Sequence, residues 1–324
     1  MTLEGSKKTR AGLVSVGMPV YNGGRFLRAA LAALLSQDYS NFEIIISDNA
    51  STDETAAICQ EYALADLRIK YYGVDESKEP AWNFARVYEL SRGEYFMWAA
   101  HDDIRHPQYL SRCVEALEQN PRALFCCTGV KFIDVEGLDV TDAFGAVTLR
   151  PAGATPLARL RALARSTYWV DFYSLFRTRS LVGTRLRREV WGGDVLFVAA
   201  LCLRGEVAEI PEPLFSYRLF FDKSGQDVAG SLNVPLSWIH LTLEMLKNIW
   251  CSPLGFLEKA HVAWMFVIEF CIRNKVVSSY IREEGFSGVR YAFTHKHPLR
   301  ALAMAALAVV PFAGTYFRRA RQRV

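Results

Sequence analysis

Strand-like and helix-like patterns alternate along the first 130 residues. Short apolar runs predict strands over 13–18, 42–47, 68–72, 94–99 and 123–132. The segments between them repeat apolar residues at helical spacing, over about 24–37, 52–65, 80–91 and 107–119. The run Ile44-Ile45-Ile46 is continuously apolar, as expected for a strand that is buried on both faces. This order predicts an α/β fold with a doubly wound, mostly parallel sheet.

The second half of the chain has a different pattern. Residues 141–155 contain glycine and proline and are typical of a loop. The sequence then predicts a basic helix over 157–165, a strand over 172–176, a helix over 196–204 and short strands over 207–210 and 214–218. From about residue 232 it becomes helical, over 236–250 and 257–280.

We therefore expect three parts: a flexible N-terminus over 1–12, an α/β domain over 13–230 and a helical extension over 231–324. The change of pattern divides the domain into halves, 13–135 and 136–230. With 324 residues, of which 51% are hydrophobic and 22% charged, the chain can form a sizeable core. Its net charge of only +4 argues against nucleic acid as a partner.

The cysteines and the N-terminus bear on the cellular compartment. The seven cysteines show neither the paired spacing of a zinc site nor the pattern of a small disulfide-stabilised domain. The first residues are polar and basic, and no apolar run of the signal-peptide type follows them. Both features predict a cytoplasmic protein with reduced thiols.

The C-terminal end combines an apolar run with basic flanks. Residues 301–317 carry no charge, and four arginines follow within 318–324. A spanning helix needs about 20 predominantly apolar residues, so we favour a helix that lies in the membrane interface with its arginines at the headgroups. A spanning helix and a helix buried against the domain are the alternatives. The favoured interpretation predicts peripheral contact of 296–324 with the inner face of the plasma membrane, while the helices after residue 232 could pair with a second copy.

Two adjacent acids, Asp102 and Asp103, follow the buried strand predicted over 94–99. Carboxylates at such a position are costly unless a cation or hydrogen-bond donors neutralise them. Mn²⁺ or Mg²⁺ bridging a diphosphate would do so, because both ions prefer hard oxygen ligands. The alternative is that the two side chains only cap the helix that begins near Pro107.

Polar residues also follow the first two predicted strands. Tyr21-Asn22 and Asp48-Asn49 should meet the acid pair at one edge of the sheet, where α/β sheets bind ligands. Asp48 suits a ribose hydroxyl or a base edge, although an Asx turn would also explain it. No glycine-rich phosphate-binding motif occurs. A metal and side chains would therefore have to neutralise phosphate.

Asp194 follows Trp191-Gly192-Gly193 and precedes an apolar helix. A carboxylate is favourable at a helix N-terminus, so capping alone can explain it. The functional alternative is a general base that takes the proton from an acceptor hydroxyl. The two glycines would leave room for the substrate, and Trp191 would contact the acceptor.

Together these segments resemble family 2 glycosyltransferases of the GT-A fold. The resemblance rests on four strings in order: Val16-Gly17-Met18-Pro19-Val20-Tyr21-Asn22, then Ile44-Ile45-Ile46-Ser47-Asp48-Asn49-Ala50-Ser51-Thr52-Asp53, then Trp82-Asn83, and Arg92-Gly93-Glu94-Tyr95 before Asp102-Asp103. It is strong over 13–135 and looser over 165–218. It implies a GT-A type doubly wound mixed sheet, with 13–135 as the nucleotide-binding half and 136–230 as the acceptor half.

The resemblance also implies roles for single residues. The nucleoside would be lined by Pro19, Tyr21, Asn22, Asp48 and Asn83. Asp102 would face the ribose or diphosphate, and Asp103 would ligate the metal. Asp194 stands where the family has its catalytic base, and the family inverts the anomeric centre. Asp171 and Arg177 would lie on the acceptor side, and Arg218 is a weaker candidate for the diphosphate.

The expected activity is transfer of one sugar from a nucleotide-diphosphate sugar to a saccharide or lipid-linked acceptor, in the assembly of a bacterial surface glycan. Two departures leave donor details open: Ala100 and Gly193 stand where the family often has acids. The Q-x-x-R-W string of processive synthases is missing. The alternatives are a catalytically silent GT-A scaffold at the membrane and a metal-dependent nucleotidyltransferase.

Overall fold

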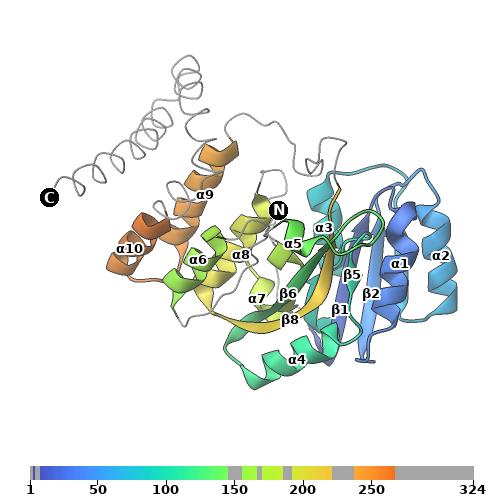
Figure 1. Ribbon diagram of the computed structural model, residues 1–324, viewed down its shortest axis with the longest axis horizontal. Helices are drawn as coiled ribbons and strands as arrows, with labels where there is room; N and C mark the ends of the chain where they lie inside the picture. Colours follow the sequence, from blue (N-terminus) through green and yellow to red (C-terminus); the bar gives the residue numbers. More distant parts are fainter. Residues whose placement is uncertain are drawn as a thin grey trace, which may run out of the picture.

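The computed structural model describes residue 3 and residues 8–144, 155–165, 170–184, 192–220 and 237–266. Within these ranges eight strands form one mixed sheet, in the order β3-β2-β1-β4-β7-β6-β8-β5 (Figure 1). The strands are β1 (Arg10–Val20), β2 (Phe42–Asp48), β3 (Ile69–Gly73), β4 (Gly93–Trp98), β5 (Ile104–Arg105), β6 (Ala123–Ile133), β7 (Leu175–Arg177) and β8 (Glu206–Arg218).

Helices cover both faces of this sheet. They are α1 (Gly24–Leu35), α2 (Thr55–Ala65), α3 (Pro80–Leu90), α4 (Tyr109–Gln119), α5 (Thr141–Phe144), α6 (Pro156–Arg165), the 3₁₀ helix η1 (Val170–Tyr173), α7 (Thr178–Leu181), α8 (Gly193–Arg204), α9 (Ser237–Cys251) and α10 (Phe256–Phe266). Side chains of α1, α2 and α4 share one core cluster, whereas α3, α6, α8, α9 and α10 contribute to the other.

The strand β2 shows why the sheet has two cores. Ile44 and Ile46 lie in the core with α1 and α2, and Ile45 lies in the core with α3 and α8. All three are at most 1% exposed, which confirms the prediction of a strand buried on both faces. Strands β3, β2, β1 and β4 are parallel. Because β7 runs antiparallel between β4 and β6, the sheet is mixed rather than mostly parallel.

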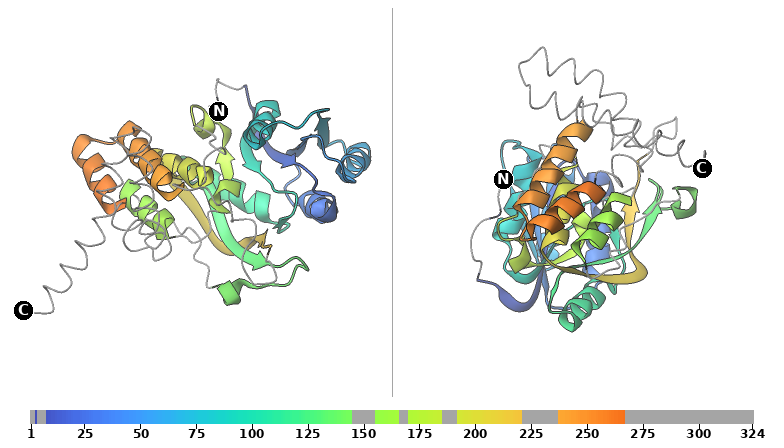
Figure 2. Two further views of the ribbon diagram at one scale, coloured as in Figure 1. Left: turned by 90° about the horizontal axis from the view of Figure 1, so that it is seen from above. Right: turned by 90° about the vertical axis from the view of Figure 1, so that its left-hand side faces the viewer.

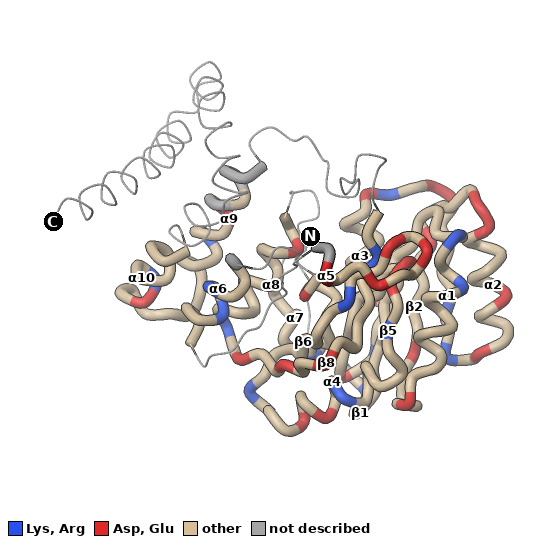
Figure 3. The backbone as a smooth tube through the Cα atoms, in the orientation of Figure 1, with Lys and Arg blue, Asp and Glu red and all other residues tan. Residues whose placement is uncertain are grey.

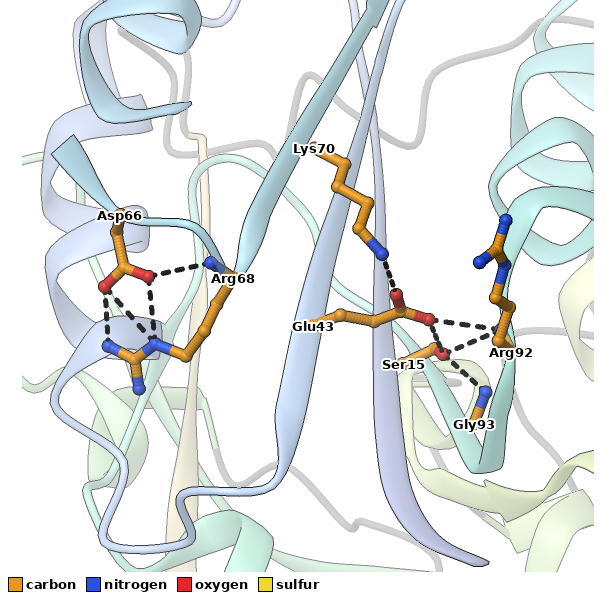
Figure 4. Close-up of polar contacts among 7 residues, drawn as sticks. All are labelled: Ser15, Glu43, Asp66, Arg68, Lys70, Arg92 and Gly93. Atoms are coloured by element: carbon orange, nitrogen blue, oxygen red, sulfur yellow. Dashed lines mark hydrogen bonds and ion pairs between the residues drawn. The ribbon is translucent and has the colours of Figure 1, made fainter. Parts of the chain in front are cut away.

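A polar network fastens the strands at the edge of the sheet where β1 and β2 begin (Figure 4). The carboxylate of Glu43 accepts hydrogen bonds from Lys70, from the Ser15 hydroxyl at 2.7 Å and from the Arg92 amide at 3.1 Å. The Ser15 oxygen in turn accepts the Gly93 amide at 2.8 Å. Burial alone would raise the pKa of Glu43, but these donors outweigh it and hold the pKa below its usual value.

Close backbone packing at the same edge requires a glycine. A Cβ on Gly93 would lie only 2.5 Å from the carbonyl oxygen of Tyr95 and 2.6 Å from that of Leu13. Nearby, the guanidinium of Arg68 forms a two-pronged ion pair with Asp66 in the turn between α2 and β3 (Figure 4). Side-chain hydrogen bonds and ion pairs therefore stabilise this edge of the sheet, and a larger residue at Gly93 would not fit.

Within the N-terminal segment 1–12, Leu3 and the residues from 8 onward are described. Leu3 is 2% exposed, and its backbone pairs with the turn after α7: its amide donates to the Thr184 carbonyl at 2.9 Å and its carbonyl accepts the Gly183 amide at 2.7 Å. The strand β1 already begins at Arg10. Burial of one leucine side chain and two backbone hydrogen bonds thus hold part of this segment on the domain.

The C-terminal helices pack beside the second half of the domain. Helix α9 lies on α8, where the Asn248 side chain donates to the Leu196 carbonyl at 3.2 Å, and α10 lies against α6 and α9. Figure 2 shows α9 and α10 at the end of the molecule that is farthest from α1 and α2. None of the helices in the described ranges has the length and apolar character needed to cross a bilayer. The helix expected beyond residue 266 and the tail 296–324 lie outside the described residues.

Candidate functional site

The loops after β1 and β2 are joined at the edge where these strands end. The register pairs Val20 with Asp48. Asn22 adopts a left-handed backbone (φ 51°), its amide donates to the Ser51 hydroxyl at 2.9 Å, and its side-chain oxygen accepts the Thr52 amide at 2.8 Å. Pro19 lies buried in β1, and Tyr21 is 52% exposed beside it. The structure thus brings together the predicted residues of these two loops.

Asp48 is held at the end of β2 by hydrogen bonds to both carboxylate oxygens. Oδ1 accepts the amide and the hydroxyl of Ser51, and Oδ2 accepts the Tyr71 hydroxyl at 2.9 Å. The amide bond to Ser51 is the turn contact that was the alternative to ligand binding. Burial and the bonds to Asp48 raise the pKa of Tyr71, so this phenol stays protonated and donates.

Asn83 fixes the ends of β1 and β2 from helix α3. Its Nδ2 donates to the carbonyl of Ser47 at 3.0 Å and to that of Val20 at 3.4 Å. Its Oδ1 is buried and accepts no hydrogen bond. One acceptor of this 4% exposed amide is therefore without a partner beside the ends of β1 and β2, which is a position suited to an N–H donor of a ligand.

The acid loop after β4 touches the loop after β1. A Cβ on Gly23 would lie 2.6 Å from Cδ2 of His101, so the imidazole rests on the glycine backbone. The Gly23 amide donates to the Thr55 hydroxyl at 2.8 Å, and the Gly24 amide donates to Asp53 at 3.0 Å. The loops after β1, β2 and β4 consequently form one continuous rim.

Asp103 is the most unusual group on this rim. Its Oδ1 accepts the Arg218 amide at 2.9 Å, while its Oδ2 is buried without a hydrogen-bond partner. The side chain is 4% exposed. Burial, and then the charge of neighbouring Asp102, raise the pKa of Asp103 to about 7. A carboxylate with one oxygen unsatisfied in the interior is strained electrostatically and favours a cation or a proton.

The residues present fit a divalent cation. Mg²⁺ is commonly held by one or two carboxylates together with substrate phosphates, and the pair Asp102 and Asp103 matches that pattern. Asp103 supplies a free buried oxygen, and the half-buried Asp102 is its neighbour. In the part of the chain that the structure describes, no group of three or more metal-ligating side chains occurs. Phosphate oxygens and water would therefore have to complete the coordination.

Arg218 joins three segments behind the acid pair. Its Nε donates to the Asp102 carbonyl at 2.9 Å, its Nη1 donates to the Asp134 carbonyl at 2.6 Å, and its guanidinium lies 4.6 Å from the centroid of the Phe26 ring. The side chain is buried and two of its donors are used by the backbone. Arg218 lies beside Asp102, near the predicted diphosphate site. Its side chain contacts only backbone carbonyls and the Phe26 ring among the interactions seen.

Arg105 is a residue that the sequence analysis missed. Its guanidinium is buried 3.4 Å from the centroid of the Phe215 ring, Nη2 donates to the Tyr173 carbonyl at 3.2 Å, and Nε and Nη1 have no hydrogen-bond partner. Its charge lowers the pKa of Asp103 but less than burial and Asp102 raise it. Its place in the sequence, two residues after Asp103, could have indicated a positive charge near the acid pair.

The candidate base lies at the start of α8. Asp194 is half-buried in the first turn, and its Oδ1 accepts the Val195 amide at 2.9 Å. Gly192 has φ 72°, and a Cβ there would lie 3.0 Å from Leu241 of α9. This first-turn position agrees with capping, and the role of Asp194 as a base stays a prediction. Trp191 lies outside the described residues.

Two predicted acceptor residues do not lie at the rim. Asp171 is buried in η1 with its Oδ2 unpartnered, and burial, with a small effect of Glu209, raises its pKa to about 8. The guanidinium of Arg177 donates to the carbonyls of Ala123 at 3.0 Å and Leu117 at 2.6 Å. Because Arg177 pairs with Tyr95 near the start of β4, it lies toward the opposite edge of the sheet. Both side chains are buried, and their role on the acceptor side stays a prediction.

Solved structures share this architecture. The chain superimposes on TarS of S. aureus in complex with UDP-GlcNAc with a TM-score of 0.67 and 14% identity, covering 94% of this chain and 91% of that one. It also matches the mannosyltransferase PcManGT from Pyrobaculum calidifontis in complex with GDP-Man and Mn²⁺, with a TM-score of 0.51, 15% identity and coverage of 95% and 89%. The fold is therefore of the GT-A type, as predicted.

The sequence relationship defines the family. The model of Glycosyl transferase family 2 matches residues 15–181, slightly more than half of the chain, and the chain belongs to this family. An uncharacterised glycosyltransferase of Rickettsia typhi is 32% identical over 130 residues, which are 40% of this chain. The match spans only 39% of the length of that relative.

Proposed function

We propose that the protein is an inverting glycosyltransferase that moves one sugar from a nucleotide-diphosphate sugar to an acceptor hydroxyl. The observation that carries this proposal is the buried, unpartnered Oδ2 of Asp103 on the rim formed by the loops after β1, β2 and β4. Nucleoside recognition, diphosphate neutralisation and proton removal each need different groups, and the family and the rim supply candidates for all three.

The donor would bind along this rim. Asn83 Oδ1 is an open acceptor for a base N–H, and Asp48, held by Ser51 and Tyr71, presents a fixed carboxylate for the nucleoside. Pro19, Tyr21 and Asn22 shape the adjoining loop. The neighbouring structures support a nucleoside diphosphate sugar as donor class, since one is in complex with UDP-GlcNAc and another with GDP-Man.

Asp103, with Asp102 beside it, would hold Mn²⁺ or Mg²⁺ against the diphosphate. The cation would stabilise the negative charge that develops on the departing nucleoside diphosphate. The Arg218 amide keeps Oδ1 of Asp103 occupied, so that Oδ2 is the oxygen left for the ion. Asp194 would take the proton of the acceptor hydroxyl. The acceptor oxygen would then attack the anomeric carbon from the side opposite the leaving group.

We further propose the division of the chain that the pattern suggested, with 13–135 for the nucleotide, 136–230 for the acceptor and 231–324 as a helical extension. The basic tail over 296–324 supports a site of action at the inner face of the plasma membrane. A saccharide or lipid-linked precursor of a surface glycan is the acceptor class that fits such a location.

The test is a screen of nucleotide sugars for slow hydrolysis with and without Mn²⁺, since transfer to water needs no acceptor. We expect metal-dependent release of the nucleoside diphosphate from one donor, and its loss in Asp103→Asn. Metal-dependent nucleotide binding without turnover of any donor or acceptor would instead identify a silent scaffold. Release of pyrophosphate from a nucleoside triphosphate would identify a nucleotidyltransferase.

A further inference from the structure

Large apolar side chains are exposed where α9 meets α10. We call this group the α9–α10 patch: Trp250 (47% exposed), Phe256 (71%), Leu257 (82%) and Trp264 (64%). The rings of Trp250 and Phe256 are in contact, with centroids 5.8 Å apart. Leu257 and the exposed Ala260 and Trp264 follow one another at helical spacing, so they share a face of α10.

The opposite side of α10 is already used for packing. Val262 and Phe266 are 1% and 4% exposed and belong to the core with α6 and α9. The patch therefore lies outside the core contacts of α10, on a helix that also exposes Glu258 and His261. Groups of large exposed apolar side chains mark interaction sites. In Figure 3 most of the α10 tube carries neither acidic nor basic residues.

The chemistry of the patch and of the sequence that follows it indicates the partner. Tryptophan and phenylalanine are favoured at the boundary between lipid headgroups and acyl chains. Directly after α10, residues 267–324 contain ten lysines and arginines against three acids. Such a segment is attracted to anionic lipid, and each basic residue near the surface adds to the attraction.

We propose that the α9–α10 patch docks on the surface of an anionic lipid bilayer. Its aromatic and leucine side chains enter the interfacial layer. The patch itself is built on α9 and α10, whereas the attraction to anionic lipid comes from the sequence after Phe266, which includes the tail 296–324.

Helix α9 connects the docking surface to the candidate base Asp194. Leu241 of α9 contacts the turn at Gly192, two residues before Asp194. Trp250 lies nine residues further along the same helix, about 14 Å along its axis. This part of the inference rests on the proposed function: with the patch in the headgroup layer, α9 holds Asp194 within reach of a saccharide carried on a lipid.

The experiment measures binding of the full chain to vesicles of phosphatidylcholine with and without phosphatidylglycerol, by flotation. We expect binding to the anionic vesicles, and at least about tenfold weaker binding by the double variant Leu257→Ser and Trp264→Ser. The matched control is Leu64→Ser with Leu67→Ser, which removes two leucines that are 88% and 94% exposed at the other end of the molecule. The control should bind like the wild type.

A second measurement does not depend on substitution. Brominated acyl chains should quench part of the tryptophan fluorescence of the wild type, because Trp250 and Trp264 enter the interface while Trp98 is buried in the core. Absence of quenching would overturn the proposal, as would wild-type levels of vesicle binding by the patch variant. A patch variant that changes a dimer into a monomer without weakening vesicle binding would assign the patch to a second copy.

Hydrolysis of the nucleotide sugar in solution separates this inference from the proposed function. The patch variant should hydrolyse the donor at the wild-type rate, since none of its substituted residues touches the rim. Vesicle binding with no hydrolysis by any form of the protein would refute the proposed function and leave the docking surface intact. Hydrolysis without vesicle binding would refute only the docking surface.

Discussion

The backbone amide of Arg218 donates to Oδ1 of Asp103 at 2.9 Å, which joins the end of β8 to the acid loop after β4. The side chain of the same residue holds the carbonyls of Asp102 and Asp134. Arg218 thus holds both acids: its backbone amide binds the Asp103 carboxylate, and its side chain binds the Asp102 carbonyl. Substitution of the side chain separates these contributions, because the amide remains.

Arg218→Lys should destabilise the protein by about 2 kcal/mol, since a lysine cannot donate to both carbonyls in the geometry of the guanidinium. Urea unfolding measures the change. The control is Arg112→Lys, whose ion pair with Glu212 is exposed to solvent, so its loss should change stability much less. Equal losses in the two variants would contradict a structural role for the Arg218 side chain.

Asp103→Asn should abolish the effect of metal on thermal stability. The wild type should gain stability when Mn²⁺ and a nucleoside diphosphate are added together, because ligands that bind only the folded state raise the Tm. The variant lacks the negative oxygen and should show no gain, as measured by differential scanning fluorimetry. Asp139→Asn, at an exposed turn beside Thr141, should respond like the wild type.

Asp194→Asn should lower turnover by about 10²–10⁴-fold, the usual effect of losing a general base. The affinity for the donor should change little, because the proposed base acts on the acceptor hydroxyl and not on the donor. Hydrolysis rates and nucleotide titration measure the two quantities. The corresponding change at Asp142, in the first turn of α5, should leave turnover unaltered. Full turnover by the Asp194 variant would reject it as the base.

Asp171→Asn should stabilise the protein increasingly as the pH rises. In the folded state burial keeps this carboxyl protonated up to about pH 8, whereas its usual pKa is 3.8. The native state therefore binds more protons than the unfolded state between these values, so its stability falls as the pH rises through that window. We expect a gain in Tm of a few degrees at about pH 9 and little gain at about pH 4.

Three other ionisable side chains lie near Asp171: Glu209, Cys127 and Cys202. Glu209 raises its pKa slightly, and the buried thiols Cys127 and Cys202 remain protonated because burial raises their pKa values. Neither thiol should lose a proton below about pH 9. A difference between variant and wild type that is independent of pH would show that the carboxyl does not titrate in this way.

Glu43→Gln should have the opposite pH dependence. The folded-state pKa of Glu43 lies below its usual value of 4.5, so its ionised form contributes stability above that value, and this is lost as the pH falls through the folded pKa. We expect a loss of about 1–3 kcal/mol near pH 7, because three hydrogen bonds to a charged oxygen are weakened. Urea unfolding at several pH values should show the loss shrinking toward acid pH.

The first half of the fold could be predicted because its strands are continuous apolar runs that the sheet buries on both faces. Other elements carry too little periodicity. Strand β5 has two residues and exists only by pairing with β8. The run 172–176 was predicted as a strand, whereas η1 occupies 170–173 and β7 begins at Leu175. Short apolar runs of this kind do not distinguish a strand from a helical turn.

The prolines explain why β8 was predicted as two strands. Pro211 and Pro213 interrupt the apolar pattern, but the pairing with β6 continues past them through register shifts near Gly129. A Cβ on Gly129 would lie 2.4 Å from the Pro211 carbonyl oxygen, so the close approach requires glycine. The irregular segment is accommodated by its partner strand, which local sequence alone cannot indicate.

The rim acids could be predicted because they follow buried strands, and parallel strands end at one edge. The positions of Asp171 and Arg177 could not, because a buried carboxyl and an arginine bonded to backbone carbonyls look like surface residues in the sequence. The hydroxyl of Ser51, whose role the sequence did not indicate, bridges Asn22 and Asp48. Such roles depend on contacts between loops that are distant in sequence.

The polar network at the edge remote from the acid loop connects β1, β2, β3 and β4 through hydrogen bonds among Ser15, Glu43, Lys70 and Gly93. Strand alignment is thereby decided away from the loops that would meet substrate. Under the proposed function, substitutions in those loops would alter sugar preference while the strands keep their register. Specificity and strand alignment would then depend on residues at opposite edges of the sheet.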